Sequence, residues 1–470
     1  MSATATTEKK YLKWYQKLAY GSGDLASNCS YGLVSSFVLL YLTGTLGLDS
    51  AIIGSLMLAS KVLDGISDVI FGTLIDRTHS KLGKARPWML FGQVGVSLCL
   101  FLLFAIPAGS TTMQYIYFFI VYTALNAVFY TANGIAYSSL VALITKNNNE
   151  RVQLGSFRFM FAVVTNIFMG FAVTGMVEKF GSGAAGWRTT ALIFAIVGLV
   201  VNTISCLAVK ELPEEELGDN TSEAAEEGKA VAEEKKHGFA ETAKILVHNK
   251  YYLMILAIYI VYYIMSNLTT GAGVFCATYY WGDGSLLGQF SMMKMFPVII
   301  ALAIAPVLIK KTGSMQKVNF WGYAISSVLG TPMIYFAMQK NISMFLLFMF
   351  IKGIFAGTLS GSLNALIAEA SGYTTRTTGV HMDGMMYSCS SLGVKVGGGI
   401  GTAAVGWLLK LGGFVGTATV QSESAIRMIF NLYITFPFVI GIIITVLLAF
   451  LDVEKANKKW DAEHQKEAQA

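Results

Sequence analysis

The chain has 470 residues, of which 54% are hydrophobic and only 13% are charged. Soluble domains carry about 25% charged residues, so this composition excludes an ordinary water-soluble globule. The apolar residues fall in long blocks, and a helix that spans a bilayer needs about 20 such residues. We therefore expect an all-α membrane protein, because the backbone of a spanning segment must satisfy its own hydrogen bonds. We attribute the net charge of +6 to membrane topology and expect no nucleic-acid partner.

The apolar blocks divide into two sets of six, which predicts twelve transmembrane helices. The first set lies at roughly 18–45, 50–75, 86–107, 112–145, 152–178 and 186–208. The second lies at roughly 250–281, 286–309, 317–338, 342–367, 383–410 and 424–451. The expected organisation is an N-terminal tail at 1–17, a six-helix half at 18–208, a polar central loop at 209–249, a second half at 250–451 and a tail at 452–470.

Charge in the connections predicts the orientation. Lys and Arg gather in the two tails and in alternate connections, whereas the opposite connections hold only Lys179, Arg188, Lys340, Lys410 and Arg427. Cytoplasmic connections carry the excess of positive charge, so both termini and the central loop are expected in the cytoplasm. No cleavable signal is evident in the first 17 residues, and we expect a multi-pass plasma-membrane protein. Twelve helices in two halves are the architecture of major facilitator transporters.

The second predicted helix carries three charged residues at membrane depth. Lys61, Asp64 and Asp68 are spaced i, i+3 and i+7, so they project from one helical face. Charges at this depth are costly and usually mark ion or substrate pathways. Two neighbouring carboxylates repel each other unless one is protonated or a cation sits between them. This pattern favours a Na⁺ or H⁺ site, and a static salt-bridge cluster is the alternative.

Two further polar positions favour a ligand pocket. Asp24 and Asn28 lie i, i+4 on the first helix, where they suit a hydroxyl-rich ligand or an interhelical hydrogen bond. Arg158, about two turns from Arg151, is expected either to bind a sugar or a carboxylate or to extend towards the headgroups.

Three lysines of the second half also lie in apolar segments. Lys395 lies in mid-membrane among glycines and needs an anionic partner, for which the helix 2 carboxylates are candidates. Lys294 and Lys352 each lie close enough to a predicted helix end to extend towards the interface, so we assign them no role. The five cysteines show neither metal nor disulfide spacing. No nucleophile–base set is evident, so neither an enzyme nor a cofactor is expected.

The loop after the second helix gives a specific resemblance. The pattern D-x-T-x-S-x-x-G-x-x-R-P-W begins at Asp76 and follows a D-x-x-x-D motif formed by Asp64 and Asp68. The YGSGD opening of helix 1 and the Y-S-x-x-x-L-x-x-K pattern that ends at Lys395 also match. The chain resembles the glycoside–pentoside–hexuronide:cation symporters, the melibiose-permease branch of the major facilitator superfamily, along its whole length.

The resemblance implies residue roles. Positions that match the family's cation site are Asp64, Asp68, Thr131 and Lys395, and sugar contacts match Asn28, Arg158 and the helix 4 stretch from Asn133 through Tyr137 to Ser138. Ser67 stands where the family has an Asn between the carboxylates, which leaves Na⁺ and H⁺ both open. The melibiose permease has an Asp at the position of Asn28, so galactoside specificity does not transfer.

The expected function is import of a sugar, namely a glycoside, pentoside or hexuronide, with Na⁺ or H⁺ by alternating access. The expected partners are the sugar, a monovalent cation and the lipid bilayer, with a monomer as the working unit. If Na⁺ is the coupling ion, Asp64 and Asp68 are its ligands. The alternatives are a transporter of lipids, lysolipids or another organic solute in the same superfamily, and a sugar sensor that does not transport.

Overall fold

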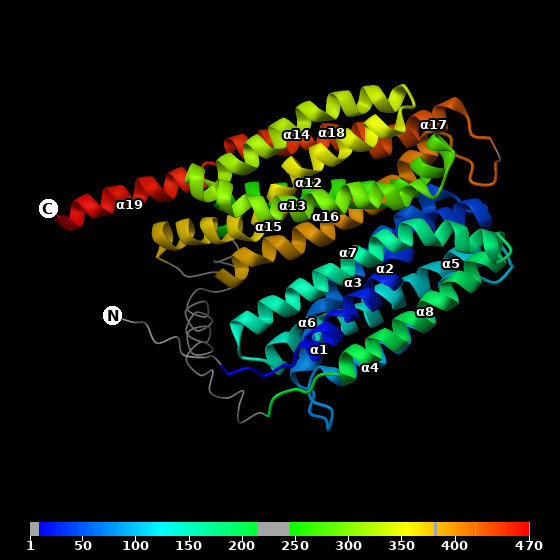
Figure 1. Cartoon of the computed structure of the whole chain (residues 1–470), viewed down its shortest axis with the longest axis horizontal. Coiled ribbons are helices and arrows are strands. Elements are labelled where there is room, and N and C mark those ends of the chain that lie inside the picture. Colours follow the sequence, from blue (N-terminus) through cyan, green and yellow to red (C-terminus); the bar gives the residue numbers. More distant parts are fainter. Residues whose placement is uncertain (1–8, 214–244, 380–382, 419, 470) are drawn as a thin grey trace. The chain divides into compact units, whose positions relative to one another are not determined.

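A computed structural model describes residues 9–213, 245–379, 383–418 and 420–469 (Figure 1). Most of the expected central loop at 209–249 lies outside these residues. The described chain divides into two compact units. Unit 1 comprises the residues up to 219 together with 277–288 and 406–425, and unit 2 comprises 220–276, 289–405 and 426–470.

Unit 1 contains the first set of helices. Their bounds are α1 Trp14–Gly21, α2 Gly23–Leu40, η1 Tyr41–Thr45, α3 Ser50–Asp76, α4 Arg86–Leu103, α5 Thr111–Thr123, η2 Ala124–Tyr130, α6 Thr131–Ile144, α7 Asn148–Lys179 and α8 Gly183–Leu207. The elements labelled η are short π-helical segments that continue their neighbouring α-helices.

The second set begins after residue 249 and makes up most of unit 2. Its bounds are α12 Lys250–Phe275, η4 Cys276–Trp281, α13 Leu286–Thr312, α14 Met315–Met338, α15 Ile342–Thr378, α16 Asp383–Leu411, α17 Glu423–Phe430, η5 Asn431–Thr435, α18 Phe436–Phe450 and α19 Val453–Gln469. The end of α16 and the segment around η4 belong to unit 1.

The helices are long enough to cross a membrane. Ten candidate spans are found among the described residues by length and apolarity. Outside that set, α3 and α14 have 27 and 24 residues, or about 40 and 36 Å at 1.5 Å per residue, which exceeds a hydrocarbon core of about 30 Å. Together these helices match the twelve expected spans.

Small residues let helices approach closely beside the first span. A Cβ on Gly23 would lie 2.8 Å from the Tyr137 ring, so only glycine fits there without movement. The Tyr137 hydroxyl donates to the Tyr20 carbonyl at 2.7 Å, and the Tyr20 hydroxyl donates back to the Tyr137 carbonyl at 2.5 Å. This reciprocal pair fixes α1 against α6.

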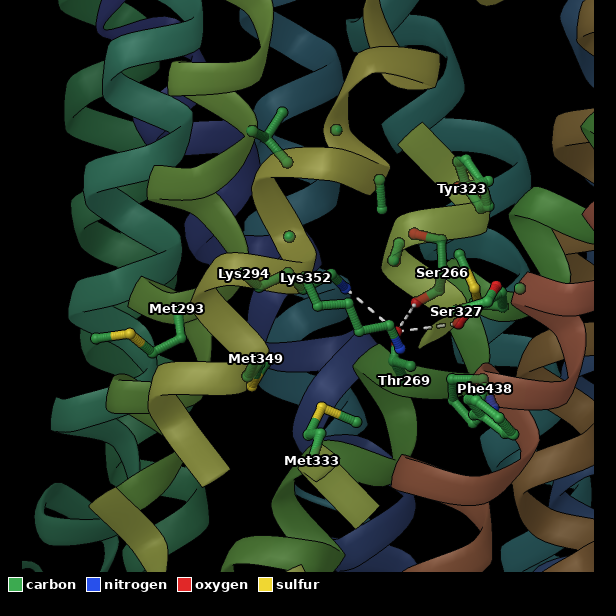
Figure 2. A pocket seen from close by; sticks show the side chains of 18 of the residues that line it. Ser266, Thr269, Met293, Lys294, Tyr323, Ser327, Met333, Met349, Lys352 and Phe438 are labelled. Atoms are coloured by element: carbon green, nitrogen blue, oxygen red, sulfur yellow. Dashed lines mark hydrogen bonds between the residues drawn. The ribbon is translucent and has the colours of Figure 1, made fainter. Parts of the chain in front are cut away.

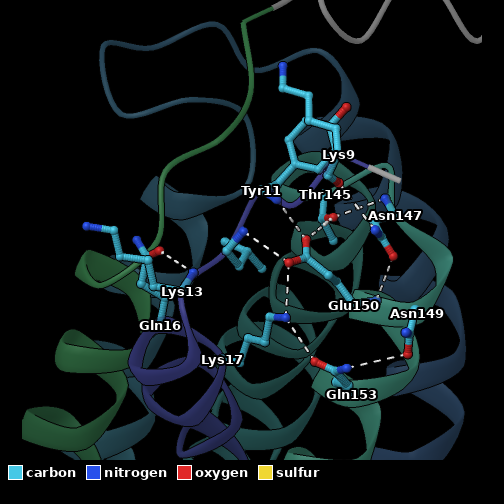
Figure 3. Close-up of polar contacts among 11 residues, drawn as sticks. Lys9, Tyr11, Lys13, Gln16, Lys17, Thr145, Asn147, Asn149, Glu150 and Gln153 are labelled. Atoms are coloured by element: carbon cyan, nitrogen blue, oxygen red, sulfur yellow. Dashed lines mark hydrogen bonds and ion pairs between the residues drawn. The ribbon is translucent and has the colours of Figure 1, made fainter. Parts of the chain in front are cut away.

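A buried carboxylate anchors the chain that enters α1. Glu150 of α7 accepts hydrogen bonds from the backbone amides of Tyr11 and Leu12, each at 3.2 Å. It also pairs with the Lys17 ammonium at 3.0 Å and accepts from the Thr145 hydroxyl at 2.7 Å. Figure 3 shows these groups converging on Glu150. A buried carboxylate is stable only when its oxygens are paired in this way.

The two sets of helices repeat the same end of their first span. The first span ends in the π-helical segment η1, followed by Gly47 at φ +69°, and the seventh ends in η4, followed by Gly282 at φ +80°. An aspartate follows each glycine: Asp49 accepts from the amide of Ala51 at 2.9 Å, and Asp283 accepts from the amide of Ser285 at 2.8 Å. The positive φ explains the glycines, because side chains with a Cβ are disfavoured there.

A second repeat starts the third helix of each set. Gly83 and Gly313 take positive φ values of +106° and +63°. After Gly83, Glu211 accepts from three successive backbone amides at the start of α4, at 2.7–3.0 Å. After Gly313, Glu454 accepts from two amides at the start of α14, at 2.7 and 3.0 Å, and from the Ser314 hydroxyl. A carboxylate on free helical amides is favourable because it satisfies orphan donors at the positive end of the helix dipole.

Unit 1 also contains contacts between the start of α3 and the end of α16. The charge pattern predicts that these helix ends lie on the side away from the cytoplasm. The Asp49 carboxylate pairs with the Lys410 ammonium at 2.6 Å. The Ser50 hydroxyl donates to the Gly406 carbonyl at 2.9 Å, and the Trp407 indole donates to the Ser55 hydroxyl at 2.9 Å. The start of α3 is thereby joined to the end of α16.

One helix is longer than its apolar block. The tenth span was expected to end near residue 367, but α15 continues to Thr378 and ends at Gly379 in the left-handed region. Hydropathy detects only the part of a helix that lies in lipid, whereas the helix itself ends where a C-cap glycine allows the chain to turn.

Candidate functional site

The charged face of α3 forms a compact polar cluster in unit 1. The Lys61 ammonium lies 3.5 Å from Oδ2 of Asp64. The Thr131 hydroxyl of α6 donates to Oδ1 of the same carboxylate at 2.7 Å. The Ser67 hydroxyl is directed back to the Asp64 backbone carbonyl at 2.9 Å. Asp68 lies one turn further on the same face, half-buried.

A π-helical segment positions Thr131 for this contact. Helix α6 begins at Thr131, directly after η2, and the Thr131 hydroxyl also donates to the Asn126 carbonyl five residues earlier at 2.9 Å. π-helical turns are uncommon and are found at functional sites, because the extra residue rotates the side chains that follow. Here the rotation directs a hydroxyl from α6 towards a carboxylate of α3.

The composition of this cluster limits which ion it can hold. Among the described residues, no group of three or more His, Cys, Asp or Glu side chains could hold a metal ion. A transition-metal site is therefore not formed by these side chains. A hard monovalent cation prefers oxygen ligands, and the Asp64 carboxylate, the neighbouring Asp68 and the Thr131 hydroxyl are of that kind. The same carboxylates could alternatively take up a proton.

A second ion pair lies between α2 and α7. The Arg158 Nε donates to Oδ2 of Asp24 at 2.7 Å. The Arg158 guanidinium also lies 4.2 Å from the centre of the Tyr137 ring. Asp24 is thus the carboxylate partner of Arg158, and the Tyr137 ring provides a second favourable contact for the guanidinium charge. The Arg158 side chain does not extend to the headgroups.

Asn28 extends this group along α2. Its Nδ2 donates to the Asp24 carbonyl at 2.7 Å, and its Oδ1 accepts from Nδ2 of Asn166 on α7 at 2.9 Å. Asn166 lies eight residues after Arg158 and therefore on the same helical face. Asp24, Asn28, Arg158 and Asn166 together present carboxylate, amide and guanidinium groups, which suit the hydroxyls of a sugar.

An aromatic pair joins α2 to the segment that precedes Thr131. Tyr31 of α2 and Tyr130 of η2 stack with their ring centres 5.6 Å apart. Tyr130 directly precedes Thr131, whose hydroxyl bonds to Asp64. The helix that carries Asp24 and Asn28 therefore contacts the segment that carries the Asp64 partner.

The structure places two other expected sugar contacts differently from the Asp24 group. Asn133 is buried and donates to Oε1 of Gln93 on α4 at 2.7 Å, next to Gly92, where an added Cβ would lie 3.1 Å from Asn133. The Tyr137 hydroxyl is already bonded to the Tyr20 carbonyl. Their roles in sugar binding stay predictions, and both side chains already stabilise helix contacts.

The lysines of the second set of helices lie in unit 2. Lys395 is half-buried on α16, and its pairing with the α3 carboxylates stays a prediction. Lys294 and Lys352, to which no role was assigned from the sequence, both line a pocket inside unit 2 (Figure 2). Lys294 donates there to the hydroxyls of Thr269 and Thr270 at 3.3 and 3.1 Å. Each lies about 12–15 Å from the start of its helix, too deep to reach the headgroups easily.

Sequence reasoning missed three members of this site. Tyr31, Tyr130 and Asn166 contribute to the polar surface but lie in segments rich in aromatic or small polar residues. The spacing of Asn166 from Arg158 could have indicated it. The two tyrosines carried no such signal, because their packing depends on the π-helical turn before Thr131.

Comparison with known proteins agrees with this geometry. Residues 19–455 match the MFS/sugar transport protein family. The chain is similar to an isoprimeverose transporter of Lactiplantibacillus pentosus, with 26% identity over 98% of this chain and 93% of the relative. It is also similar to a glucuronide carrier protein homologue of Escherichia coli strain K12, with 23% identity over 86% of this chain and 85% of the relative.

Solved structures show the same fold. A bacterial homologue of the human lysosomal transporter Spinster, solved in an inward-facing and unoccupied conformation, aligns with a TM-score of 0.67 at 12% identity, over 95% of this chain and 98% of that chain. The likeness at this identity concerns the fold alone. The all-helical architecture is thus that of the major facilitator transporters, and the chain belongs to the MFS/sugar transport protein family, as its resemblance to the glycoside–pentoside–hexuronide:cation symporters predicts.

Proposed function

We propose that this protein imports a sugar or glycoside together with Na⁺ or H⁺ by alternating access. The observation that carries the proposal is the Asp64 carboxylate, which is held between the Lys61 ammonium and the Thr131 hydroxyl beside a second acid, Asp68. Relatives named for transport of isoprimeverose and glucuronides support a glycoside as the solute.

The Lys61–Asp64 contact suggests how the cation is exchanged. The Lys61 ammonium neutralises Asp64 when no coupling ion is present. At 3.5 Å, this pair is longer than a well-formed charge-assisted hydrogen bond of about 2.7–2.9 Å, so it can be exchanged for a bound cation. An incoming cation at Asp64, or a proton on Asp64, replaces this interaction and releases the lysine.

The neighbouring Asp24 group receives the sugar in this proposal. Asp24, Asn28, Asn166 and Arg158 offer hydrogen bonds to hydroxyls, and the stacked Tyr31 and Tyr130 rings offer an apolar surface to a sugar ring. The Tyr31–Tyr130 stack joins α2, which carries Asp24, to the segment directly before Thr131, and this contact is the link proposed between the two sites. By linkage, the cation and the sugar must raise each other's affinity by the same factor.

The driving force is adequate for accumulation. A monovalent cation that moves down a potential of about 100 mV releases about 2.3 kcal/mol, which corresponds to a concentration ratio of roughly fifty. The positive charge of alternate connections supports cytoplasmic termini in a plasma-membrane protein. A monomer contains every group that the proposal uses.

The test is uptake of radiolabelled glycosides into proteoliposomes under an imposed Na⁺ gradient, a proton gradient or neither. We expect accumulation under one cation gradient and only equilibration without it. Asp68→Asn should remove gradient-driven accumulation. If Asp68→Asn kept full accumulation, the assignment of the cation site to α3 would be wrong. If a lysolipid were carried instead of a glycoside, the sugar assignment would be wrong.

A further inference from the structure

The connection between α3 and α4 forms one wall of a polar pocket in unit 1. This connection contains the D-x-T-x-S-x-x-G-x-x-R-P-W pattern, which neither the proposed sugar site nor the proposed cation site uses. The pocket has a volume of about 700 Å³, within the roughly 300–1,000 Å³ of small-molecule sites. Its lining consists of residues 79–84, Arg86 and residues 210–213, which follow α8. We call it the basic pocket.

The pattern gives the connection its shape. The Trp88 indole donates to the Thr78 hydroxyl at 2.8 Å, and the Ser80 hydroxyl donates to the Gly83 carbonyl at 2.7 Å. Gly83 has a positive φ, and a Cβ there would lie 2.3 Å from the carboxyl carbon of Glu211. Only glycine therefore fits where the connection passes this carboxylate. The wall of the basic pocket is thus built by short-range contacts within the pattern.

The lining of the basic pocket carries an excess of positive charge. Four of its residues are cationic, namely Lys81, Lys84, Arg86 and Lys210. Its acid, Glu211, already accepts from three successive backbone amides at the start of α4, so the helix end balances much of its charge. An anion in the pocket would meet four cations, while the carboxylate of the lining is already bonded.

Arg86 is the most enclosed of these cations. Its side chain is buried, with 8% exposed. Its Nε donates to the Cys206 carbonyl at 3.1 Å and its Nη1 to the Leu82 carbonyl at 3.4 Å. A guanidinium has five N–H donors, so further donors are left for a ligand. Lys81 and Lys210 are exposed at the rim, where their flexible side chains can turn towards a bound anion.

Exposed apolar side chains lead from the basic pocket along the two helices that end there. Six of them are more than half exposed: Phe91, Val94 and Leu98 on α4, and Val200, Ile204 and Leu207 on α8. Their spacing of three or four residues places each set on one helical face. Because α4 begins at Arg86 and α8 ends three residues before Lys210, both faces start beside the pocket. The two helices are neighbours, since the Asn202 amide donates to the Met89 carbonyl at 2.9 Å.

We propose that the basic pocket binds the headgroup of an anionic phospholipid, whose acyl chains lie along the exposed faces of α4 and α8. Arg86 binds the phosphate oxygens, and Lys81 and Lys210 add charge from the rim. The charge pattern predicts a cytoplasmic location for this end of the helices, and anionic lipids of the cytoplasmic leaflet bind basic pockets between helices. A soluble phosphate shares the headgroup chemistry, but the two apolar faces favour a lipid. The proposal depends on neither the solute nor the coupling ion.

The test is binding of phosphatidylglycerol to the purified full chain in a neutral detergent, followed by native mass spectrometry. Phosphatidylcholine with the same acyl chains is the zwitterionic counterpart. We expect phosphatidylglycerol to bind at least tenfold more tightly. The double variant Lys81→Gln with Lys210→Gln should reduce this preference to less than threefold, because two cations beside the phosphate are lost. Both lysines are exposed, so the variant should fold.

The matched control is the double variant Lys310→Gln with Lys311→Gln. These two lysines are exposed and precede Gly313, which repeats Gly83 in the second set, so the same charge is removed at the corresponding connection. The preference for phosphatidylglycerol should stay within twofold of the wild type. Equal binding of the two lipids by the wild type, or an unchanged preference in the Lys81 and Lys210 variant, would overturn the proposal.

A competition experiment separates a lipid from a soluble phosphate. sn-Glycerol 3-phosphate carries the phosphate without acyl chains, and at equal concentration it should leave phosphatidylglycerol bound. Displacement of the lipid under these conditions would overturn the lipid assignment and indicate a soluble phosphate ligand instead.

Discussion

The first and second sets of helices share their scaffold and differ in their interior charge. Each uses a glycine with positive φ and a glutamate, Glu211 or Glu454, to start its third helix. Inside the first set, the carboxylates of Asp24 and Asp64 lie beside a cation of the same unit. Inside the second set, the stretch that carries Lys294 and Lys352 has no Asp or Glu between Asp283 and Glu369.

This difference shows that the scaffold and the chemistry are encoded separately. Backbone amides at helix ends need an acceptor wherever the fold repeats, so the same solution recurs in both halves. The interior faces carry no such requirement and can specialise. The first set provides oxygen groups that suit a cation and sugar hydroxyls, whereas the second places the ammonium groups of Lys294 and Lys352 on the lining of a pocket.

The sharpest way to break this comparison is to remove the charge at the centre of the first set. Asp64→Asn keeps a side chain that can still bond to Thr131 but cannot neutralise a cation. We expect gradient-driven sugar accumulation to fall from a ratio of roughly fifty to simple equilibration, because a positive ion in the bundle would lose its counter-charge. Uptake into proteoliposomes under the imposed cation gradient is the measurement. Full accumulation by Asp64→Asn would contradict the role given to this carboxylate.

The second effect concerns the Asp24–Arg158 pair. Arg158→Gln leaves the Asp24 carboxylate without its partner, which we expect to destabilise the protein by about 2 kcal/mol, less than the roughly 3–5 kcal/mol for a fully buried pair. The apparent melting temperature in detergent is the measurement.

The double variant Asp24→Asn with Arg158→Gln separates stability from binding. It should recover most of the lost thermal stability, because no unpaired charge is left, but it should not recover sugar affinity. Recovery of sugar affinity as well would assign this pair to helix packing alone.

A smaller effect tests the repeated helix starts. Glu211→Gln and Glu454→Gln each retain one acceptor oxygen but lose the charge, and each should cost about 1–2 kcal/mol of stability. The two losses should agree within about 0.5 kcal/mol if the two sites are equivalent. Thermal denaturation of the two single variants, with Glu423→Gln as a control, would measure this. A large difference between them would contradict the structural repeat.

The smallest effect is expected at the Asp49–Lys410 pair. Burial raises the pKa of Asp49, but Lys410 and the backbone amides of Ala51 and Ile52 outweigh it, so the pKa lies below its usual value. A lowered pKa gives a contribution that is present above the unfolded pKa and is lost as pH falls through the folded one. Between pH 5 and 8 the pair should therefore be constant, and Asp49→Asn should change uptake less than about twofold. A steep change in uptake of the wild type over this range that vanishes in Asp49→Asn would contradict this assignment.

The sequence allowed prediction of the elements that hydropathy detects. The twelve spans follow from the apolar blocks. The shared face of Lys61 and Asp64 follows from helical periodicity, and its importance follows from the free-energy cost of placing charges in lipid. The contact of Thr131 with Asp64 could be expected only from the family resemblance, because a π-helical turn between them is invisible to helical periodicity. Helix ends such as Gly379 were missed because they lie outside the lipid.

The pocket that Lys294 and Lys352 line was missed for a related reason. Depth along a helix was estimated from apolar blocks, and Lys294 and Lys352 lie near enough to the ends of those blocks to suggest extension towards the headgroups. Their direction depends on packing between α13 and α15, where small residues such as Gly353 permit close contact. Such tertiary contacts between distant segments are not encoded in local periodicity.

The central claim is that the Asp64 cluster couples a cation to sugar binding, and one measurement tests it directly. Sugar affinity of the purified protein is measured by calorimetry in the presence and absence of Na⁺, and across pH without Na⁺, for the wild type and Asp64→Asn. We predict that one cation raises wild-type sugar affinity at least about fivefold, as expected of a coupling free energy of 1 kcal/mol or more, and that Asp64→Asn removes this increase while the sugar still binds. An equal increase in Asp64→Asn would contradict the account.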